Sequence, residues 1–155
     1  MATSDGIDAH DWAEVLELAA EVVNQADSPQ EAWSRRRLMR ALDELERRYG
    51  RLPSILSTRA DFSVDVAFSL SLLKEAYASA GEMSDFKNKV FISASLAELY
   101  LDTFSDRERA RYWVEMLGED LGNYADDEYF VELHEGLMAR VANDPDNSDA
   151  YKPIV

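Results

Sequence analysis

Apolar side chains recur along most of this chain at steps of three and four residues, the spacing that places them on one face of an α-helix. No stretch alternates between apolar and polar residues with the period of two that a half-buried strand shows. The pattern predicts six helices, together with a short seventh one that begins near Pro53. The six cover approximately residues 8–25, 29–49, 64–80, 85–104, 106–121 and 127–142.

Several predicted helix ends carry residues that start or stop helices. Ser28 is a good N-cap, with Pro29 at the first helical position and Glu31 completing a capping box. Gly50 is expected to end the second helix, because glycine readily adopts the left-handed conformation that closes many helices. Serines also precede the three helices that follow the short one and are expected to cap them, at Ser63, Ser84 and Ser105.

The links between the predicted helices are mostly short, which favours antiparallel neighbours. We therefore expect an all-α fold of six to seven antiparallel helices, either stacked as helical hairpins or packed as an irregular bundle. A single helical domain is expected over residues 8–142, after a flexible N-terminus at 1–7 and before a C-terminal tail at 143–155. Three leucines on the apolar stripes are expected in the core, namely Leu42, Leu73 and Leu117.

Two stretches resemble the first helix and turn of a tetratricopeptide repeat. One carries the leucine, tyrosine and glycine of the repeat at Leu73, Tyr77 and Gly81. The other matches at Leu96, Ala97 and Tyr100, and residues 143–147 look like the turn that closes such a repeat. The resemblance implies stacked hairpins with a concave surface that binds a peptide or a partner protein. The two tyrosines are 23 residues apart, whereas the repeat has a period of 34, so an irregular bundle stays open.

Residue types used for catalysis and metal binding are scarce. The chain has no cysteine, which excludes disulfides, thiolate ligands and a thiol nucleophile. Its two histidines, His10 and His134, stand close to acids, but no second histidine follows His134 at the spacing of a zinc-binding helix. The acids of residues 144–149 lack the glycine and glutamate that a calcium-binding loop needs. We expect no cofactor, no metal site and no enzymatic activity.

The chain is strongly acidic, with a net charge of −15. Such a charge repels the phosphates of nucleic acids and anionic membrane surfaces and attracts basic proteins. Hence the expected partner is another protein, with no direct nucleic-acid or membrane contact. The sequence has no apolar run long enough for a transmembrane helix, and residues 1–11 lack the features of a signal peptide, so a cytoplasmic location is expected.

Charge is divided between two poles. Residues 28–60 hold eight arginines and four acids, whereas residues 113–149 hold eleven acids and Arg140 as the only basic residue. An ordinary solvated polar face explains both poles, and so does electrostatic attraction of a partner or of a second copy, which would give a homo-oligomer. The predicted partner-binding residues come from both poles, and they are Arg36, Arg40, Arg47, Arg51, Glu119, Asp120, Tyr124, Asp127, Glu128 and Tyr129.

These features favour a non-catalytic protein–protein interaction module with an acidic surface and one Arg-rich helix. The alternative is a small acidic immunity or inhibitor protein, or a nucleic-acid mimic, that blocks a basic toxin or nuclease. An inhibitor should gather its acids on one face with exposed aromatic residues such as Tyr124 or Tyr129 among them. A repeat-type adaptor should instead line a concave groove.

Overall fold

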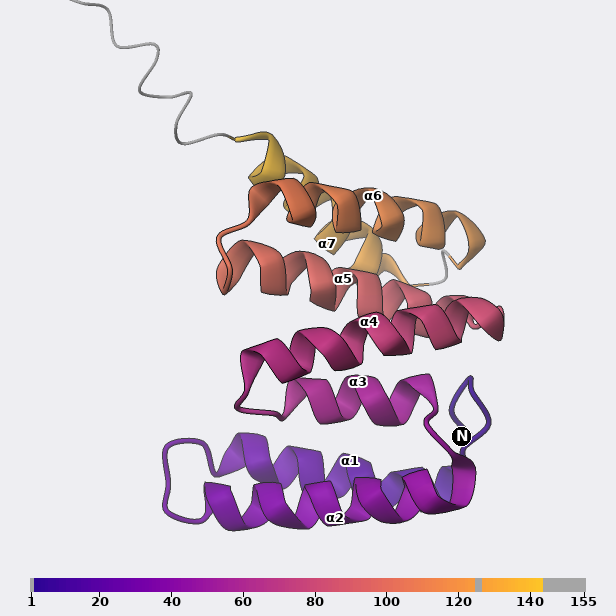
Figure 1. Ribbon diagram of the computed structural model, residues 1–155, viewed down its shortest axis with the longest axis vertical. Helices are drawn as coiled ribbons and strands as arrows, with labels where there is room; N and C mark the ends of the chain where they lie inside the picture. Colours follow the sequence, from indigo (N-terminus) through magenta and orange to yellow (C-terminus); the bar gives the residue numbers. More distant parts are fainter. Residues whose placement is uncertain (1, 125–126, 144–155) are drawn as a thin grey trace, which may run out of the picture. The chain divides into compact units, whose positions relative to one another are not determined.

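The chain is all-helical wherever its structure is described. The computed structural model describes residues 2–124 and 127–143, and within them it contains seven α-helices and no β-strand. In chain order the helices are α1 (Ala9–Asn24), α2 (Glu31–Tyr49), α3 (Pro53–Asp61), α4 (Val66–Glu82), α5 (Phe86–Asp102), α6 (Arg107–Asn123) and α7 (Glu128–Ala142), as Figure 1 shows. The all-α prediction is confirmed, and the short helix near Pro53 is α3.

The contacts within the chain define two compact units, Met1–Asn88 and Lys89–Val155. The boundary between them falls in the first turn of α5. The sequence instead predicts one helical domain over residues 8–142. The hydrophobic pattern locates helices without reporting which helices contact one another, so it contains no signal for such a boundary. Of the predicted tail at 143–155, residues 144–155 lie outside the described residues.

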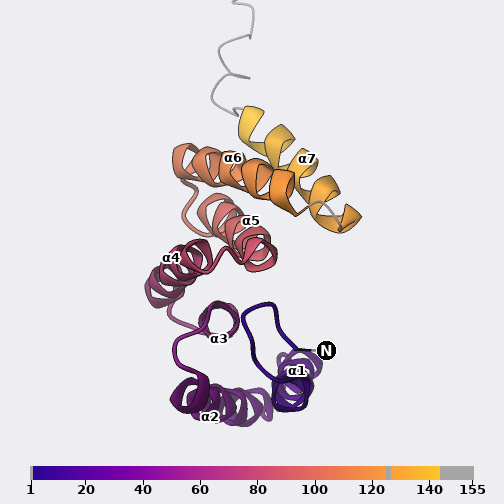
Figure 2. The ribbon, with the colours of Figure 1, turned by 90° about the vertical axis from the view of Figure 1, so that its right-hand side faces the viewer.

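In the first unit α1 pairs with α2, α3 pairs with α4, and α2 also contacts α3 (Figure 2). One cluster of buried side chains joins the segment before α1 to α1, α2 and α3, and it consists of Ile7, Val15, Leu18, Val22, Leu38, Leu42, Leu45 and Ile55. Leu42 and Leu73 are buried, which confirms two of the predicted core positions. The apolar stripe of α2 therefore orients its opposite, arginine-rich side toward solvent.

The helices that follow Ser63, Ser84 and Ser105 are capped by aspartates rather than by the predicted serines. The carboxylates of Asp65, Asp85 and Asp106 accept hydrogen bonds from backbone N–H groups three residues further along the chain, at 3.1, 3.2 and 3.1 Å. A carboxylate satisfies the same orphan N–H as a hydroxyl does and also interacts favourably with the helix dipole. Similarly, α2 begins at Glu31 without a side-chain cap from Ser28.

The first residues of the chain are part of the first unit, although the sequence predicts a flexible N-terminus at 1–7. Ile7 is fully buried, and the Thr3 backbone N–H donates to the carbonyl of Ile7 at 3.0 Å. The buried Asp5 carboxylate accepts from the backbone N–H and the hydroxyl of Ser54 at 2.7 and 2.9 Å. Asp5 thereby caps α3 from a distant part of the sequence, because Leu52 at the N-cap position has no side-chain acceptor.

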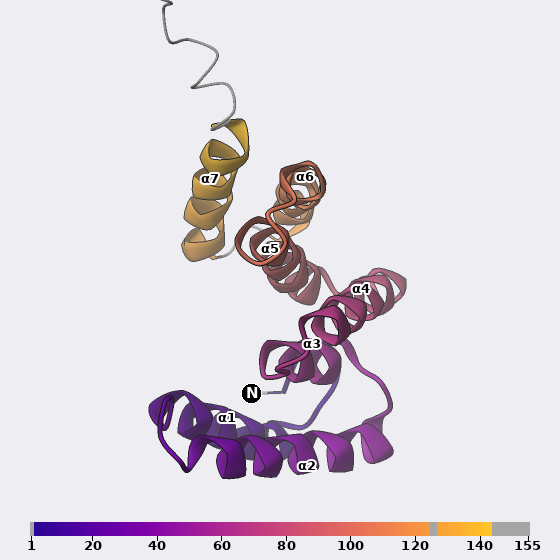
Figure 3. The ribbon, with the colours of Figure 1, turned by 60° about the vertical axis from the view of Figure 1, so that its left-hand side comes forward.

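In the second unit α6 contacts α7, and α5 contacts α7 as well. Figure 3 shows α5, α6 and α7. The rings of Phe91 and Phe130 meet edge to face with centroids 4.6 Å apart. Further along the same two helices, Asp102 forms an ion pair with Arg140. Because the two contacts come in the same order in both helices, α5 and α7 run in the same direction. Leu117 of α6 is fully buried, as predicted.

Candidate functional site

The Arg-rich side of the first unit is occupied mainly by ion pairs within the unit. Arg36 and Arg40 are exposed, and the described residues provide no ion-pair partner for either of them. Arg47 is exposed and pairs with Glu44 one turn earlier on α2. Arg51 follows the end of α2, and its guanidinium donates to both carboxylate oxygens of Glu75 at 2.8 and 2.6 Å. Two of the four predicted arginines therefore have carboxylate partners of their own.

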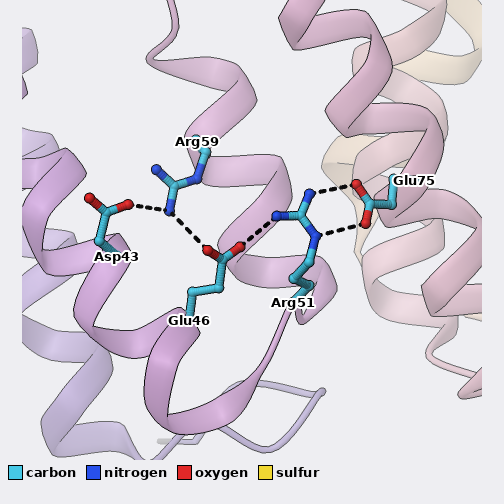
Figure 4. Close-up of polar contacts among 5 residues, drawn as sticks. All are labelled: Asp43, Glu46, Arg51, Arg59 and Glu75. Carbon is cyan, nitrogen blue, oxygen red and sulfur yellow. Dashed lines mark hydrogen bonds and ion pairs between the residues drawn. The ribbon is translucent and has the colours of Figure 1, made fainter.

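Arg51 belongs to a chain of alternating charges that links α2, α3 and α4 (Figure 4). Arg59 of α3 contacts Asp43 at 2.9 Å and Glu46 at 4.0 Å. Glu46 in turn accepts from Arg51 at 2.8 Å, and Arg51 binds Glu75. The hydrogen bonds from Arg51 lower the pKa of Glu75, and this carboxylate raises the pKa of Arg51. The network connects three helices and leaves little positive charge here for a partner.

A second set of ion pairs joins α1 to α2. Arg48 donates to the two carboxylate oxygens of Asp11 at 3.3 and 2.9 Å, and the hydroxyl of Tyr49 donates to the same carboxylate at 2.5 Å. The hydrogen bonds from Tyr49 and then from Arg48 lower the pKa of Asp11. At the other end of this helix pair, Arg37 donates to Glu21 at 3.0 Å. The surplus of arginines in residues 28–60 thus neutralises acids of α1.

The acidic pole separates into one buried and several exposed groups. Asp120 is 2% exposed, and its carboxylate lies 3.3 Å from the ammonium group of Lys89. Its prediction as a partner-binding residue is therefore wrong, because a carboxylate inside the second unit cannot meet a partner. The preceding residue, Glu119, is exposed. Asp120 follows the three- and four-residue spacing of the buried Leu117 and Leu121, which is the signal that marks it as inward-facing.

The remaining predicted residues gather at the start of α7. Asp127 is half-buried and caps this helix by accepting from the backbone N–H of Tyr129 at 3.0 Å. Tyr124 is also half-buried, at the end of α6. Glu128 and Tyr129 are exposed, with 64% of Tyr129 accessible to solvent. The rings of Tyr129 and Phe130 meet edge to face, with centroids 5.1 Å apart.

A shallow hollow of about 330 Å³ follows this face of α7 and is lined by Tyr129, Glu132, Leu133, Gly136, Leu137 and Arg140. A methyl group placed on Gly136 would meet no other atom within 4 Å, so the middle of the hollow is open. The sequence prediction includes Tyr129 but not the other residues of the hollow. The signal that could have indicated them is a glycine on the same helical stripe as Tyr129, Leu133 and Arg140.

A second acidic feature lies beside the far end of α7. Glu98 of α5 is half-buried, and this burial raises the pKa of its carboxyl group. The neighbouring Asp102 carboxylate adds to the rise and Arg140 opposes it. Because Arg140 is paired with Asp102, the charge of the guanidinium is shared between two acids.

The two histidines stand on different helices, His10 on α1 and His134 on α7. His134 is half-buried on α7, and a methyl group on Gly118 of α6 would lie 2.9 Å from its Nε2 atom. His10 is exposed in the first turn of α1. Within residues 2–124 and 127–143, no three His, Asp or Glu side chains are grouped so that they could hold a metal ion. The acids of residues 144–149 lie outside this part of the chain.

Every helix in the described ranges is too short or too polar to cross a lipid bilayer. Comparison of the chain with protein-family models, with curated proteins and with solved structures finds no match. The exposed face of α7 combines aromatic and acidic side chains with the open hollow at Gly136.

Proposed function

We propose that this protein is a non-catalytic interaction domain that binds an extended, Lys- or Arg-containing segment of another protein on the exposed face of α7. The observation that carries the proposal is the position of Tyr129. Its ring is exposed, the exposed acids Glu128 and Glu132 are close to it on the same helix, and it lines a hollow that Gly136 leaves open. An exposed aromatic ring flanked by carboxylates is a suitable anchor for a cationic side chain.

The chemistry of such a contact is simple. A guanidinium or ammonium group over the face of the Tyr129 ring would gain a cation–π interaction and could pair with Glu132 at the same time. Its aliphatic stem would cover the open space at Gly136 and the side chain of Leu133. Because the hollow lies along a single helix, a narrow extended segment fits it better than a broad folded surface.

The charge of the second unit supports a basic partner. Residues 89–155 contain fifteen Asp and Glu residues and six Lys and Arg residues. An excess of this size accelerates the approach of basic chains at low salt and disfavours acidic ones.

The alternative is an acidic inhibitor that covers the basic active site of an enzyme. What favours it is the same grouping of an exposed tyrosine with exposed acids on one face of α7. The two functions differ in what they need from the partner. An interaction domain binds the isolated segment, whereas an inhibitor binds the folded enzyme and stops its reaction.

Binding is tested with a fluorescein-labelled peptide of Arg, Lys, Gly and Pro residues, which cannot form a stable helix, and with a copy in which Glu replaces every basic residue. Fluorescence anisotropy should show saturable binding of the basic peptide that weakens as salt is added. Gly136→Leu fills the hollow with an exposed side chain and should weaken binding about tenfold. Glu132→Lys should do the same by removing the carboxylate.

The matched controls are Gly122→Leu and Glu115→Lys on α6. Gly122 also has open space around it, and both residues are exposed. If the controls weaken binding as much as the α7 variants do, the attraction is diffuse and the proposed site is excluded. If the peptide does not bind, but one equivalent of the protein blocks a purified basic ribonuclease or deoxyribonuclease, the inhibitor function replaces the proposal.

A further inference from the structure

The apolar surface of the first helix extends well beyond the side that faces the core. Val15, Leu18 and Val22 point into the core of the first unit. Next to this buried side, exposed apolar residues form a second stripe, which we call the outer stripe and which consists of Ala13, Leu16, Ala20 and Val23. Leu16 is 60% exposed and Val23 is 64% exposed. A helix on the surface of a protein ordinarily presents polar residues on the side away from the core.

The outer stripe has the spacing of a helix-packing seam. Its residues follow one another at steps of three, four and three, so that the small residues Ala13 and Ala20 and the larger residues Leu16 and Val23 each recur after seven. This repeat keeps one apolar line in contact with a neighbouring helix over several turns. The alanines allow that neighbour to approach closely, and the half-buried Trp12 and Ala19 continue the apolar surface toward the core.

The charges of α1 indicate the chemistry of the neighbour. The helix contains Asp11, Glu14, Glu17 and Glu21 and no lysine or arginine. Asp11 pairs with Arg48 and Glu21 pairs with Arg37. Glu14 and Glu17 are exposed, and no ion pair within the described residues involves either of them. Of these two, Glu17 borders the outer stripe, one turn from both Ala13 and Ala20. A carboxylate beside an apolar seam matches a helix that carries lysine or arginine beside its own apolar line.

A second copy of the chain fits the same seam poorly. Antiparallel packing of two outer stripes about their centre would bring the two Glu17 carboxylates toward each other, with no cation on α1 to separate them. Each copy also carries a net charge of −15, which opposes the approach of another. Charge therefore distinguishes a basic partner from a self-contact.

We propose that the outer stripe of α1 binds an amphipathic α-helix of another protein, one with an apolar seam flanked by lysine or arginine residues. This surface is separate in sequence from the face of α7, and it recognises a helix where α7 is proposed to recognise an extended segment. The proposal does not depend on the proposed function of α7, because different residues and a different probe carry each of them.

The probe is a synthetic peptide of about three heptads, with Leu and Ala along one seam and Lys at the flanking positions. A peptide of the same composition in scrambled order is the control. Fluorescence anisotropy with the full chain should give saturable binding of the ordered peptide. Leu16→Glu should weaken this binding about tenfold or more, because it places a charge in the seam. This variant also makes the chain more acidic, so nonspecific attraction of a basic peptide would rise rather than fall.

The control variant is Val64→Glu, since Val64 is also a highly exposed apolar residue of the first unit, outside α1. Val64→Glu and Gly136→Leu should both leave binding of the helical probe unchanged. Circular dichroism checks that each variant retains its helix content, as expected for substitutions at exposed positions. Equal binding of the ordered peptide to wild type and Leu16→Glu, or no saturable binding to a monomeric wild type, would overturn the proposal.

Sedimentation equilibrium decides whether a second copy occupies the seam instead. The proposal expects wild type and Leu16→Glu to sediment with the same mass. A wild-type dimer that Leu16→Glu converts to a monomer would show that the outer stripe is a self-contact, and the heterologous partner would be excluded.

Discussion

Arg51 and Glu75 form a bidentate ion pair in which both carboxylate oxygens accept hydrogen bonds from one guanidinium group, at 2.8 and 2.6 Å. The two residues are 24 positions apart and connect the end of α2 to α4. From the sequence Arg51 is a candidate for partner binding, whereas in the fold it already has a carboxylate in the geometry that a guanidinium prefers. We therefore expect Arg51 to contribute to the stability of the fold rather than to the binding of a partner.

Replacing Glu75 with Gln should lower the free energy of unfolding by about 0.2–1 kcal/mol at neutral pH, the range of partly exposed pairs. Since Arg51 lowers the pKa of Glu75 in the folded state, the stabilisation is present above the ordinary pKa of 4.5 and is lost as the pH falls through the lowered pKa. Urea unfolding of both proteins at pH 7 and at about pH 2–3 measures this difference. Glu82→Gln, an exposed change on the same helix, is the control; a difference that persists unchanged at low pH would contradict the expectation.

Asp120 and Glu119 should respond very differently to alanine substitution. Asp120→Ala removes the buried carboxylate and its ion pair with Lys89 and should cost about 1.5–3 kcal/mol, the range for a hydrogen bond that involves a charged group. Glu119→Ala, at the exposed neighbouring position, should change the stability by no more than about 0.5 kcal/mol. Chemical unfolding measured by circular dichroism compares the two. Similar small effects would mean that the Lys89–Asp120 pair is solvated in solution.

Glu98→Gln should stabilise the protein at neutral pH. Burial raises the pKa of Glu98, so the ionised form is less stable in the folded protein than in the unfolded chain. This penalty is fully present above the raised pKa and disappears as the pH falls below the ordinary value of 4.5, where the carboxyl group is protonated in both states. The midpoint of thermal unfolding should therefore rise at pH 7 and match wild type near pH 3. A lower midpoint for Glu98→Gln at pH 7 would refute this account.

Asp5→Ala should destabilise the first unit. The substitution removes a buried acceptor for the backbone N–H and hydroxyl of Ser54 and for the hydroxyl of Thr3, which lies 2.6 Å away. Hydrogen bonds to a charged group contribute about 1.5–3 kcal/mol, and a loss in this range is expected in urea unfolding. Asp8→Ala removes only the local cap of α1 and should cost about 1 kcal/mol. If Asp5→Ala has no larger effect than Asp8→Ala, the hydrogen bonds that Asp5 accepts from Ser54 and Thr3 contribute no more to stability than a local helix cap.

The periodicity of the sequence is sufficient to predict the helices and much of the core. Leu42, Leu73 and Leu117 are buried as the apolar stripes indicate, and Arg36 and Arg40 lie on the opposite, exposed side of α2. The helix starts are less well predicted, because Ser and Asp stand close together before three helices and both can cap. In each case the aspartate makes the bond, since its charge also suits the positive end of the helix dipole.

The candidate sites could be predicted only in part. The exposure of Glu128 and Tyr129 follows from their position at the start of the last helix. Tyr129 is both a predicted partner-binding residue and a residue that lines the hollow on α7. The outer stripe of α1 was not predictable, because a helix with such a broad apolar surface gives no indication of which part of it is buried. Which part of the apolar surface of α1 is buried depends on how α2 and the segment at Ile7 pack against the helix.

The sequence by itself determined the helical class, the residues that form the apolar stripes and the overall acidity, because each of these depends on local spacing or on composition. Only the tertiary structure decided which charged side chains form ion pairs with one another within the protein. Arg51 with Glu75, Asp11 with Arg48, and Lys89 with Asp120 are far apart in the chain or lie on different helices. Their pairing depends on distances of a few ångströms between packed helices, and the electrostatic energy depends on that distance and on burial, which no linear pattern of charges contains.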